Sequence, residues 1–82
     1  MYPLAFAKEG QKVVIKGINA GYGAVQRLSS MGLNIGAKLT VVRNQNGPVI
    51  ISTKGSNIAI GRGLAMKIMV EDCRDEGDDE KL

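Results

Sequence analysis

The sequence contains no histidine, no tryptophan and only one cysteine in 82 residues. Histidine is the side chain that most often acts as a general acid or base near neutral pH, so its absence removes the commonest catalytic group. Ser29 and Ser30 are nucleophiles by type, but the sequence offers no base to activate either hydroxyl. The single cysteine, Cys73, excludes an internal disulfide and is typical of a reducing compartment. We therefore expect that the protein is not an enzyme and that it has no catalytic residue and no cofactor.

Long apolar runs are missing as well. A membrane-spanning helix needs about 18 or more consecutive apolar residues, and no segment of this sequence is that apolar. The first residues also lack the basic stretch followed by an apolar stretch that marks a secretory signal. We expect a cytoplasmic protein that does not span a membrane.

Negative charge is nearly absent from the first 70 residues. They hold nine Lys or Arg and one acid, Glu9, for a net charge of +8, whereas residues 71–82 hold seven acids and two bases, for a net charge of −5. A basic body favours an acidic partner, such as nucleic acid, a membrane surface or an acidic protein face. We interpret residues 72–82 as an acidic, disordered tail that follows one domain over residues 1–71. The alternative is that the tail folds back over the basic surface.

A helical pattern, a glycine stop and a second glycine turn follow one another in the middle of the chain. Apolar residues recur at spacings of three and four over residues 22–31, which predicts a short helix, and Asn19 is a plausible amino-terminal cap. Gly32 directly follows the predicted helix, at the position where a helix end favours the left-handed backbone conformation. Leu33 is the next residue, from which an apolar side chain commonly packs back onto the last helical turn. Gly36 provides a second turn. We expect both glycines to be structural turn residues.

Five segments carry the β-branched and apolar residues that are typical of strands. They are residues 12–18, 38–43, 48–53, 57–60 and 67–71. Residues 1–7 are interpreted as an extended arm that packs Leu4 or Phe6 on the core, and residues 64–66 as a brief helical turn. Closing so few strands into a barrel protects their edges. We predict a mainly β fold, a small five-stranded barrel with one helix inserted after the first strand.

The glycine corner also carries a family signature. Residues 27–36 read Arg-Leu-x-x-Met-Gly-Leu-x-x-Gly, which resembles the signature of the FeoA family, small cytoplasmic proteins of bacterial ferrous-iron uptake. The likeness extends over roughly residues 3–71 and includes Leu4, the Glu9-Gly10 turn and Ala65-x-x-Ile68-x-Val70. The resemblance implies an SH3-like barrel with a helix between the first two strands. A similar domain ends some iron-dependent repressors, so the signature indicates a fold family more firmly than a function.

The resemblance further implies a partner, the FeoB-type membrane permease with its cytoplasmic GTPase domain. A small basic barrel would dock on that domain or near its junction with the membrane, and would thereby lie at the inner face of the membrane. We predict that Arg27, Met31, Leu33 and Arg62 take part in the contact, since methionine is an adaptable contact residue at partner surfaces. The alternative is that Met31 and Leu33 only attach the helix to the barrel. Weak self-association through an exposed barrel edge is a further expectation.

Metal ligands are scarce, although the family belongs to iron transport. Ferrous iron favours histidine and carboxylate ligands, and residues 1–70 offer a single carboxylate. Asp72, Cys73 and Asp75 form the only cluster of suitable donors, and a stable site needs three or four fixed ligands. We therefore predict no metal site.

Nucleic-acid binding is the alternative function, either as an RNA-binding module or as a repressor-type carboxy-terminal domain. Nine basic side chains are spread along the body of the chain. Proteins that bind single strands usually add aromatic stacking platforms, and here Tyr2, Phe6 and Tyr22 are the only aromatics. The plainer interpretation is that outward-facing lysines and arginines keep the barrel soluble. We expect no stable nucleic-acid binding.

Overall fold

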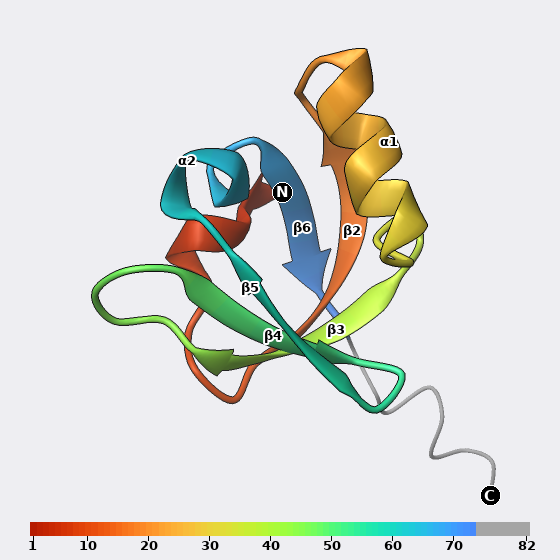
Figure 1. Ribbon diagram of the computed structural model, residues 1–82. Helices are drawn as coiled ribbons and strands as arrows, with labels where there is room; N and C mark the ends of the chain where they lie inside the picture. Colours follow the sequence, from red (N-terminus) through yellow and green to blue (C-terminus); the bar gives the residue numbers. More distant parts are fainter. Residues whose placement is uncertain (74–82) are drawn as a thin grey trace, which may run out of the picture.

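The computed structural model describes residues 1–73, which form one curled antiparallel sheet (Figure 1). The strands are β1 (Tyr2–Pro3), β2 (Lys12–Ile18), β3 (Lys38–Arg43), β4 (Val49–Thr53), β5 (Ser56–Ile60) and β6 (Ile68–Asp72). A 3-10 helix, η1 (Leu4–Phe6), and two α-helices, α1 (Tyr22–Ser30) and α2 (Arg62–Ala65), lie between them. The strand order is β1-β6-β2-β3-β4-β5. Of the predicted tail over residues 72–82, only Asp72 and Cys73 belong to the described residues.

The predicted mainly β fold with one helix after the first long strand is confirmed, and the five predicted strands correspond to β2 through β6. The strand count was one short, because β1 lies within the predicted extended arm. Tyr2 pairs with Val70 and Pro3 pairs with Met69. A strand of two residues, one of them proline, is too short to show the alternation of apolar and polar residues from which a strand is predicted. Proline is tolerated there because β1 is an edge strand, where a missing N–H need not break the ladder.

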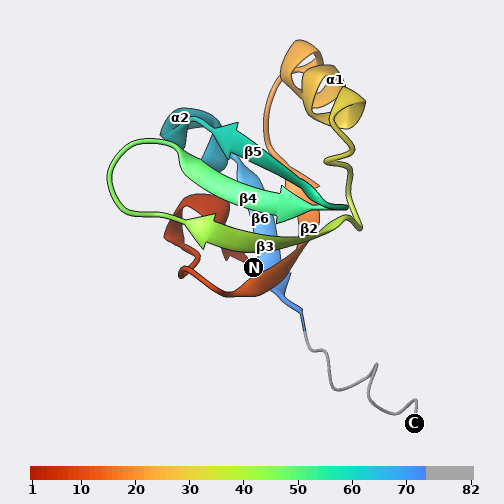
Figure 2. The same cartoon turned by 60° about the horizontal axis from the view of Figure 1, so that its bottom comes forward.

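The sheet curls around one side (Figure 2), and an aliphatic core of buried side chains fills its inside. Alternate residues of β4 are buried because successive side chains of a strand point to opposite faces. In the predicted arm, Leu4 is completely buried whereas Phe6 is 65% exposed, so Leu4 is the residue that joins the core. The largest fully buried side chains are Leu4, Ile15, Leu28, Leu33, Ile51, Ile68, Val13, Val41, Val49 and Val70.

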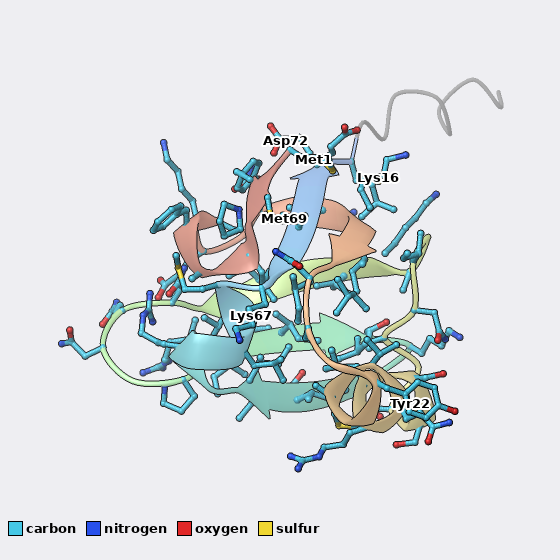
Figure 3. The ribbon with its side chains drawn as sticks, turned by 90° about the horizontal axis from the view of Figure 1, so that it is seen from above. Met1, Lys16, Tyr22, Lys67, Met69 and Asp72 are labelled. Atoms are coloured by element: carbon cyan, nitrogen blue, oxygen red, sulfur yellow. The ribbon has the colours of Figure 1, made fainter. Side chains whose placement is uncertain are left out.

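Helix α1 stands out from the sheet and is attached mainly at its carboxyl end (Figure 1). Leu28 is its one buried residue, and Tyr22 at the other end is 77% exposed, with its ring on the outer side of the helix (Figure 3). The predicted cap at Asn19 is wrong: the cap position is Gly21, and no side chain caps the helix. Asn19 instead directly follows strand β2, and its N–H donates a 2.7 Å hydrogen bond to the carbonyl of Lys67.

Tyr2 fastens the short edge strand β1 to the end of β6. Its hydroxyl donates a 2.6 Å hydrogen bond to Asp72 Oδ1, and Gln11 Nε2 donates to the same oxygen. Burial, followed by the hydrogen bond to the Asp72 carboxylate and its negative charge, raises the pKa of Tyr2 from 10.0 to about 12. The neutral phenol is therefore favoured by folding.

We expect Tyr2 to make the folded state sensitive to alkaline pH. A group whose pKa is raised by folding contributes its full stabilisation below the unfolded pKa of 10.0 and loses it as pH rises through about 12. Unfolding measured by urea should therefore show a decline in stability between these pH values that is smaller in Tyr2→Phe. A Tyr22→Phe background leaves Tyr2 as the only tyrosine, so tyrosinate absorbance reports its titration directly. Identical alkaline profiles for the parent and Tyr2→Phe proteins would contradict this prediction.

Candidate partner-binding surface

The corner that ends helix α1 is a Schellman motif, in which two backbone bonds close the last turn. The N–H of Gly32 donates to the carbonyl of Ser29 at 2.9 Å, and the N–H of Leu33 donates to the carbonyl of Leu28 at 2.9 Å. Gly32 has φ +82°, the left-handed conformation that the motif requires. Leu28 and Leu33 are both completely buried, as expected for the apolar contact that accompanies this motif.

The loop that follows is held against strand β2. The N–H of Gly36 donates to the carbonyl of Ile15 at 2.7 Å, and the N–H of Ile15 donates to the carbonyl of Ala37 at 2.9 Å. Gly36 has φ +96°, so it also uses a conformation that favours glycine. These bonds hold the loop over residues 31–36, which we call the corner loop, in a defined position at one end of the barrel.

The corner loop exposes only some of its apolar side chains. Met31 is 38% exposed and Ile35 is 65% exposed, whereas Leu33 is 0% exposed. Arg27 is exposed on the last turn of α1, one helical turn before Met31. The prediction that Leu33 contacts a partner is therefore corrected: its side chain attaches the corner to the core. The spacing in the sequence does not distinguish Leu33 from Ile35, since both lie beside a glycine turn.

A hollow of about 470 Å³ lies beside the corner loop. It is bounded by the loop on one side and by the β4–β5 turn on the other, and its lining residues are Gly32, Asn34, Ile35, Gly36, Ala37, Lys38, Thr53 and Lys54. Lys38 and Lys54 give the hollow positive charge, and no acidic side chain is among its lining residues. The surface thus combines exposed apolar groups with cations, which suits an acidic protein face that carries apolar side chains.

Arg62, the fourth predicted contact residue, does not lie at the corner. It begins α2, which lies on the other side of the barrel from the carboxyl end of α1 (Figure 1). Its guanidinium donates to the carbonyl of Gly47 at 2.8 Å, to Asn44 Oδ1 at 2.7 Å and to the carbonyl of Ala5 at 3.2 Å. The structure therefore brings Arg27 and Met31 together but gives Arg62 a position in which its donors bind the protein's own hairpin.

The side chain of Asn44 connects Arg62 to the segment over residues 5–7. Asn44 Nδ2 donates to the carbonyls of Ala5 and Ala7 at 2.9 and 2.6 Å, and its backbone N–H donates to Glu9 Oε2 at 2.8 Å. We call the side chains of Asn44 and Arg62 together the hairpin latch. Asparagine is common in turns, so an asparagine at the start of a hairpin loop is interpreted as a turn residue. No pattern in the sequence indicates its contacts with residues 35 or more positions away.

Three lysines line another hollow, of about 300 Å³, at the other face of the β4–β5 turn. Its lining residues are Lys12, Lys38, Leu39, Thr40, Ser52, Thr53, Lys54 and Cys73. None of these is aromatic, so the hollow offers positive charge and hydroxyl groups without a stacking platform. It is the feature that best fits the alternative of nucleic-acid binding.

The predicted donors Asp72, Cys73 and Asp75 lie only partly within the described residues. Within residues 1–73 no group of three or more acidic, cysteine or histidine side chains lies together. The carboxylate of Asp72 accepts hydrogen bonds from Tyr2 and Gln11, and Asp75 lies outside the described residues. Over the same described range, no helix has the length and apolarity needed to cross a membrane.

The curled sheet, the single protruding helix and the corner loop define a small SH3-like β domain. A family model described as the FeoA domain matches residues 2–72. A Methanocaldococcus jannaschii protein named "Putative Fe(2+) transport protein A" is 77% identical over 82 residues, which cover all of both chains. The chain belongs to the FeoA family.

Solved structures agree with this assignment. The crystal structure of an iron uptake regulatory protein (FeoA) is 42% identical, covers 87% of this chain and 96% of its own, and superposes with a TM-score of 0.81. The manganese regulator SloR shares the fold with a TM-score of 0.79, at 18% identity, over 88% of this chain and 34% of its own. At that identity the similarity to SloR concerns the fold alone.

Proposed function

We propose that the protein is a non-enzymatic accessory protein of ferrous-iron uptake, which binds the cytoplasmic GTPase region of a FeoB-type permease. Membership of the FeoA family and the name of the 77% identical relative support the role in iron transport. The observation that carries the binding role is the corner loop, where Met31 and Ile35 are exposed beside cationic side chains. We place the protein in the cytoplasm, at the inner face of the membrane when it is bound.

The proposed contact surface consists of Arg27, Met31 and Ile35, with Lys38 and Lys54 at its rim. Apolar groups that a partner buries contribute affinity, while surrounding cations mainly accelerate association with an acidic face and set its orientation. The corner loop is suited to this because its backbone is already held by the Schellman motif and by β2. Little conformational entropy is then lost on binding.

The test is a titration of the full chain against the isolated GTPase domain of its cognate permease, with and without guanine nucleotide. Met31→Asp should raise the Kd at least about tenfold, which corresponds to about 1.4 kcal/mol, because it places a charge in a buried apolar contact. Met66→Asp is the matched control, since Met66 is 45% exposed and follows α2, away from the corner. Equal loss of affinity in both variants would contradict the proposed surface.

The alternative that the protein binds nucleic acid rests on the three lysines of the second hollow, Lys12, Lys38 and Lys54. Its signature would be an affinity for RNA or DNA that falls steeply with salt, because phosphate contacts release counterions. Saturable binding to the GTPase domain at near-physiological salt, with no such binding to nucleic acid, supports the permease. The reverse pattern supports the alternative.

A further inference from the structure

The two edges of the sheet are protected to very different degrees. An exposed edge strand can pair with a strand of another chain. Proteins prevent such pairing with short edge strands, proline, inward-pointing charges or elements that cover the edge. Strand β1 is two residues long and contains Pro3. Strand β5 has five residues, Ser-Asn-Ile-Ala-Ile, with no proline and no charged side chain, and within residues 1–73 it pairs with β4 alone. The edge of β5 is thus the one that the described residues leave open.

The turn that joins β4 to β5 determines which backbone groups point outward. Lys54 and Gly55 have φ +52° and +82°, as in a two-residue type I′ turn, and Thr53 pairs with Ser56 across it. In such a hairpin the closing pair is hydrogen-bonded, and hydrogen-bonded pairs then alternate along the ladder. Ser56, Ile58 and Ile60 therefore direct their N–H and C=O groups toward β4. Asn57 and Ala59 direct theirs outward, and both residues are exposed.

We propose that the β5 edge is a docking site for an extended, acidic segment of a protein partner, which pairs with the outward backbone groups of Asn57 and Ala59. Strand addition of this kind obtains affinity from main-chain hydrogen bonds and specificity from side chains at alternate positions. A cationic residue stands at each end of the edge, Lys54 before β5 and Arg62 after it. The guanidinium of Arg62 is held in the hairpin latch by neutral oxygens, which do not cancel its positive charge. Acidic side chains near the ends of the added segment complement these charges.

A second copy of this chain fits the edge less well. An antiparallel pairing of two β5 strands about a two-fold axis at Ile58 would place Lys54 of one copy opposite Arg62 of the other, since the two positions lie four residues on either side of Ile58. Lys54 lies in the turn before β5 and Arg62 in the helix after it, so the like charges would meet just beyond the two ends of the paired strands, where they repel each other. The predicted weak self-association is therefore opposed at this edge, and an acidic partner is favoured.

The inference goes beyond the proposed function and does not depend on the permease. Lys54 lines the hollow beside the corner loop, so the β5 edge begins where the proposed contact surface ends. The edge nevertheless makes its contacts through backbone groups of β5, while the corner makes its contacts through side chains of Arg27, Met31 and Ile35. Variants at Ala59 and at Met31 therefore test the two surfaces separately.

The experiment uses the full chain and a blocked seven-residue peptide, Glu-Val-Thr-Val-Thr-Val-Glu, and follows amide signals and hydrogen exchange by NMR. We expect exchange at Asn57 and Ala59 to be fast in the free protein and to slow by at least about tenfold at saturating peptide, because hydrogen-bonded amides exchange only on opening. Ile58 and Ile60 should be protected in both states. The peptide Lys-Val-Thr-Val-Thr-Val-Lys is the matched control and should bind at least about tenfold more weakly.

Ala59→Pro is the decisive variant. Proline removes the outward N–H of residue 59 and no hydrogen bond to β4, which is the position where edge strands accept it. It should abolish protection at residue 57 while the signals of the core remain. Should Ala59→Pro not fold, Lys54→Gln provides the second test, and it should weaken binding of the acidic peptide severalfold. Unchanged exchange at Asn57 and Ala59 at millimolar peptide, equal affinity of the two peptides, or full protection in Ala59→Pro would overturn the proposal.

Discussion

Leu33→Asp is expected to unfold the protein. The side chain of Leu33 is 0% exposed and packs at the helix stop with Leu28. Removing a buried leucine side chain costs about 2–5 kcal/mol, and aspartate adds the cost of a buried, unpaired charge. Small domains have a total free energy of unfolding of about 5–15 kcal/mol. Far-ultraviolet circular dichroism and the dispersion of NMR signals should show loss of the native fold at room temperature.

Met31→Asp is the matched comparison, two residues earlier in the same corner. Met31 is 38% exposed, and the carboxylate can point into solvent, so we expect a change in the free energy of unfolding of no more than about 1 kcal/mol. Comparison of the two variants therefore separates attachment of the helix to the core from contact with a partner, two roles that the sequence did not assign to one residue or the other. A folded Leu33→Asp protein, or a Met31→Asp protein as unstable as Leu33→Asp, would contradict the assignment of Leu33 to the core and Met31 to the surface.

Asn44→Ala should produce the second large loss of stability. Asn44 donates to the partly buried carbonyls of Ala5 and Ala7 and accepts from Arg62, so the substitution removes three hydrogen bonds, although the carbonyl of Ala5 keeps its bond from Arg62. One hydrogen bond contributes about 0.5–1.5 kcal/mol net to stability, and we expect a total loss of about 2–4 kcal/mol in urea unfolding. For a domain of this size, that corresponds to a decrease in Tm of roughly 10–25 °C.

The neighbouring exposed residue provides the control for the hairpin latch. Gln45→Ala should change the free energy of unfolding by less than about 0.5 kcal/mol, as is usual for surface positions. Arg62→Ala and Asn44→Ala both remove the hydrogen bond between these two side chains. The loss in the free energy of unfolding of the double variant should therefore be smaller than the sum of the two single losses. Additive effects, or an Asn44→Ala protein as stable as Gln45→Ala, would contradict the latch.

The elements that could be predicted from sequence are those specified by local chemistry. The helix over residues 22–31 ends one residue earlier in the structure, at Ser30, and Gly32 and Gly36 have the positive φ angles that their positions require. Segments rich in β-branched and apolar residues located β2 through β6. Strand β1 was missed because its pairing with β6 connects residues about 70 positions apart, and no local pattern encodes such a pairing.

The candidate surface was only partly predictable for the same reason. The four-residue spacing of Arg27 and Met31 puts the two residues on one face at the end of the helix predicted over residues 22–31, and Met31 directly follows α1 in the structure. The sequence could not separate buried Leu33 from exposed Ile35, because burial depends on what the rest of the chain brings to that side. It also assigned Arg62 to the contact, although the hairpin over residues 44–47 lies within reach of its guanidinium only after β3, β4 and η1 have folded together.

By itself the amino-acid sequence determined the helix, its glycine stop, the strand segments and the family, since each follows from side-chain periodicity or from a contiguous motif. The tertiary structure alone decided which residues of the corner remain exposed, that Asn44 and Arg62 bind the protein's own backbone, and that no other strand of residues 1–73 pairs with the outer edge of β5. These properties arise from contacts and hydrogen bonds between residues that are distant in the chain. Such interactions are set by the packing of the whole sheet around one core.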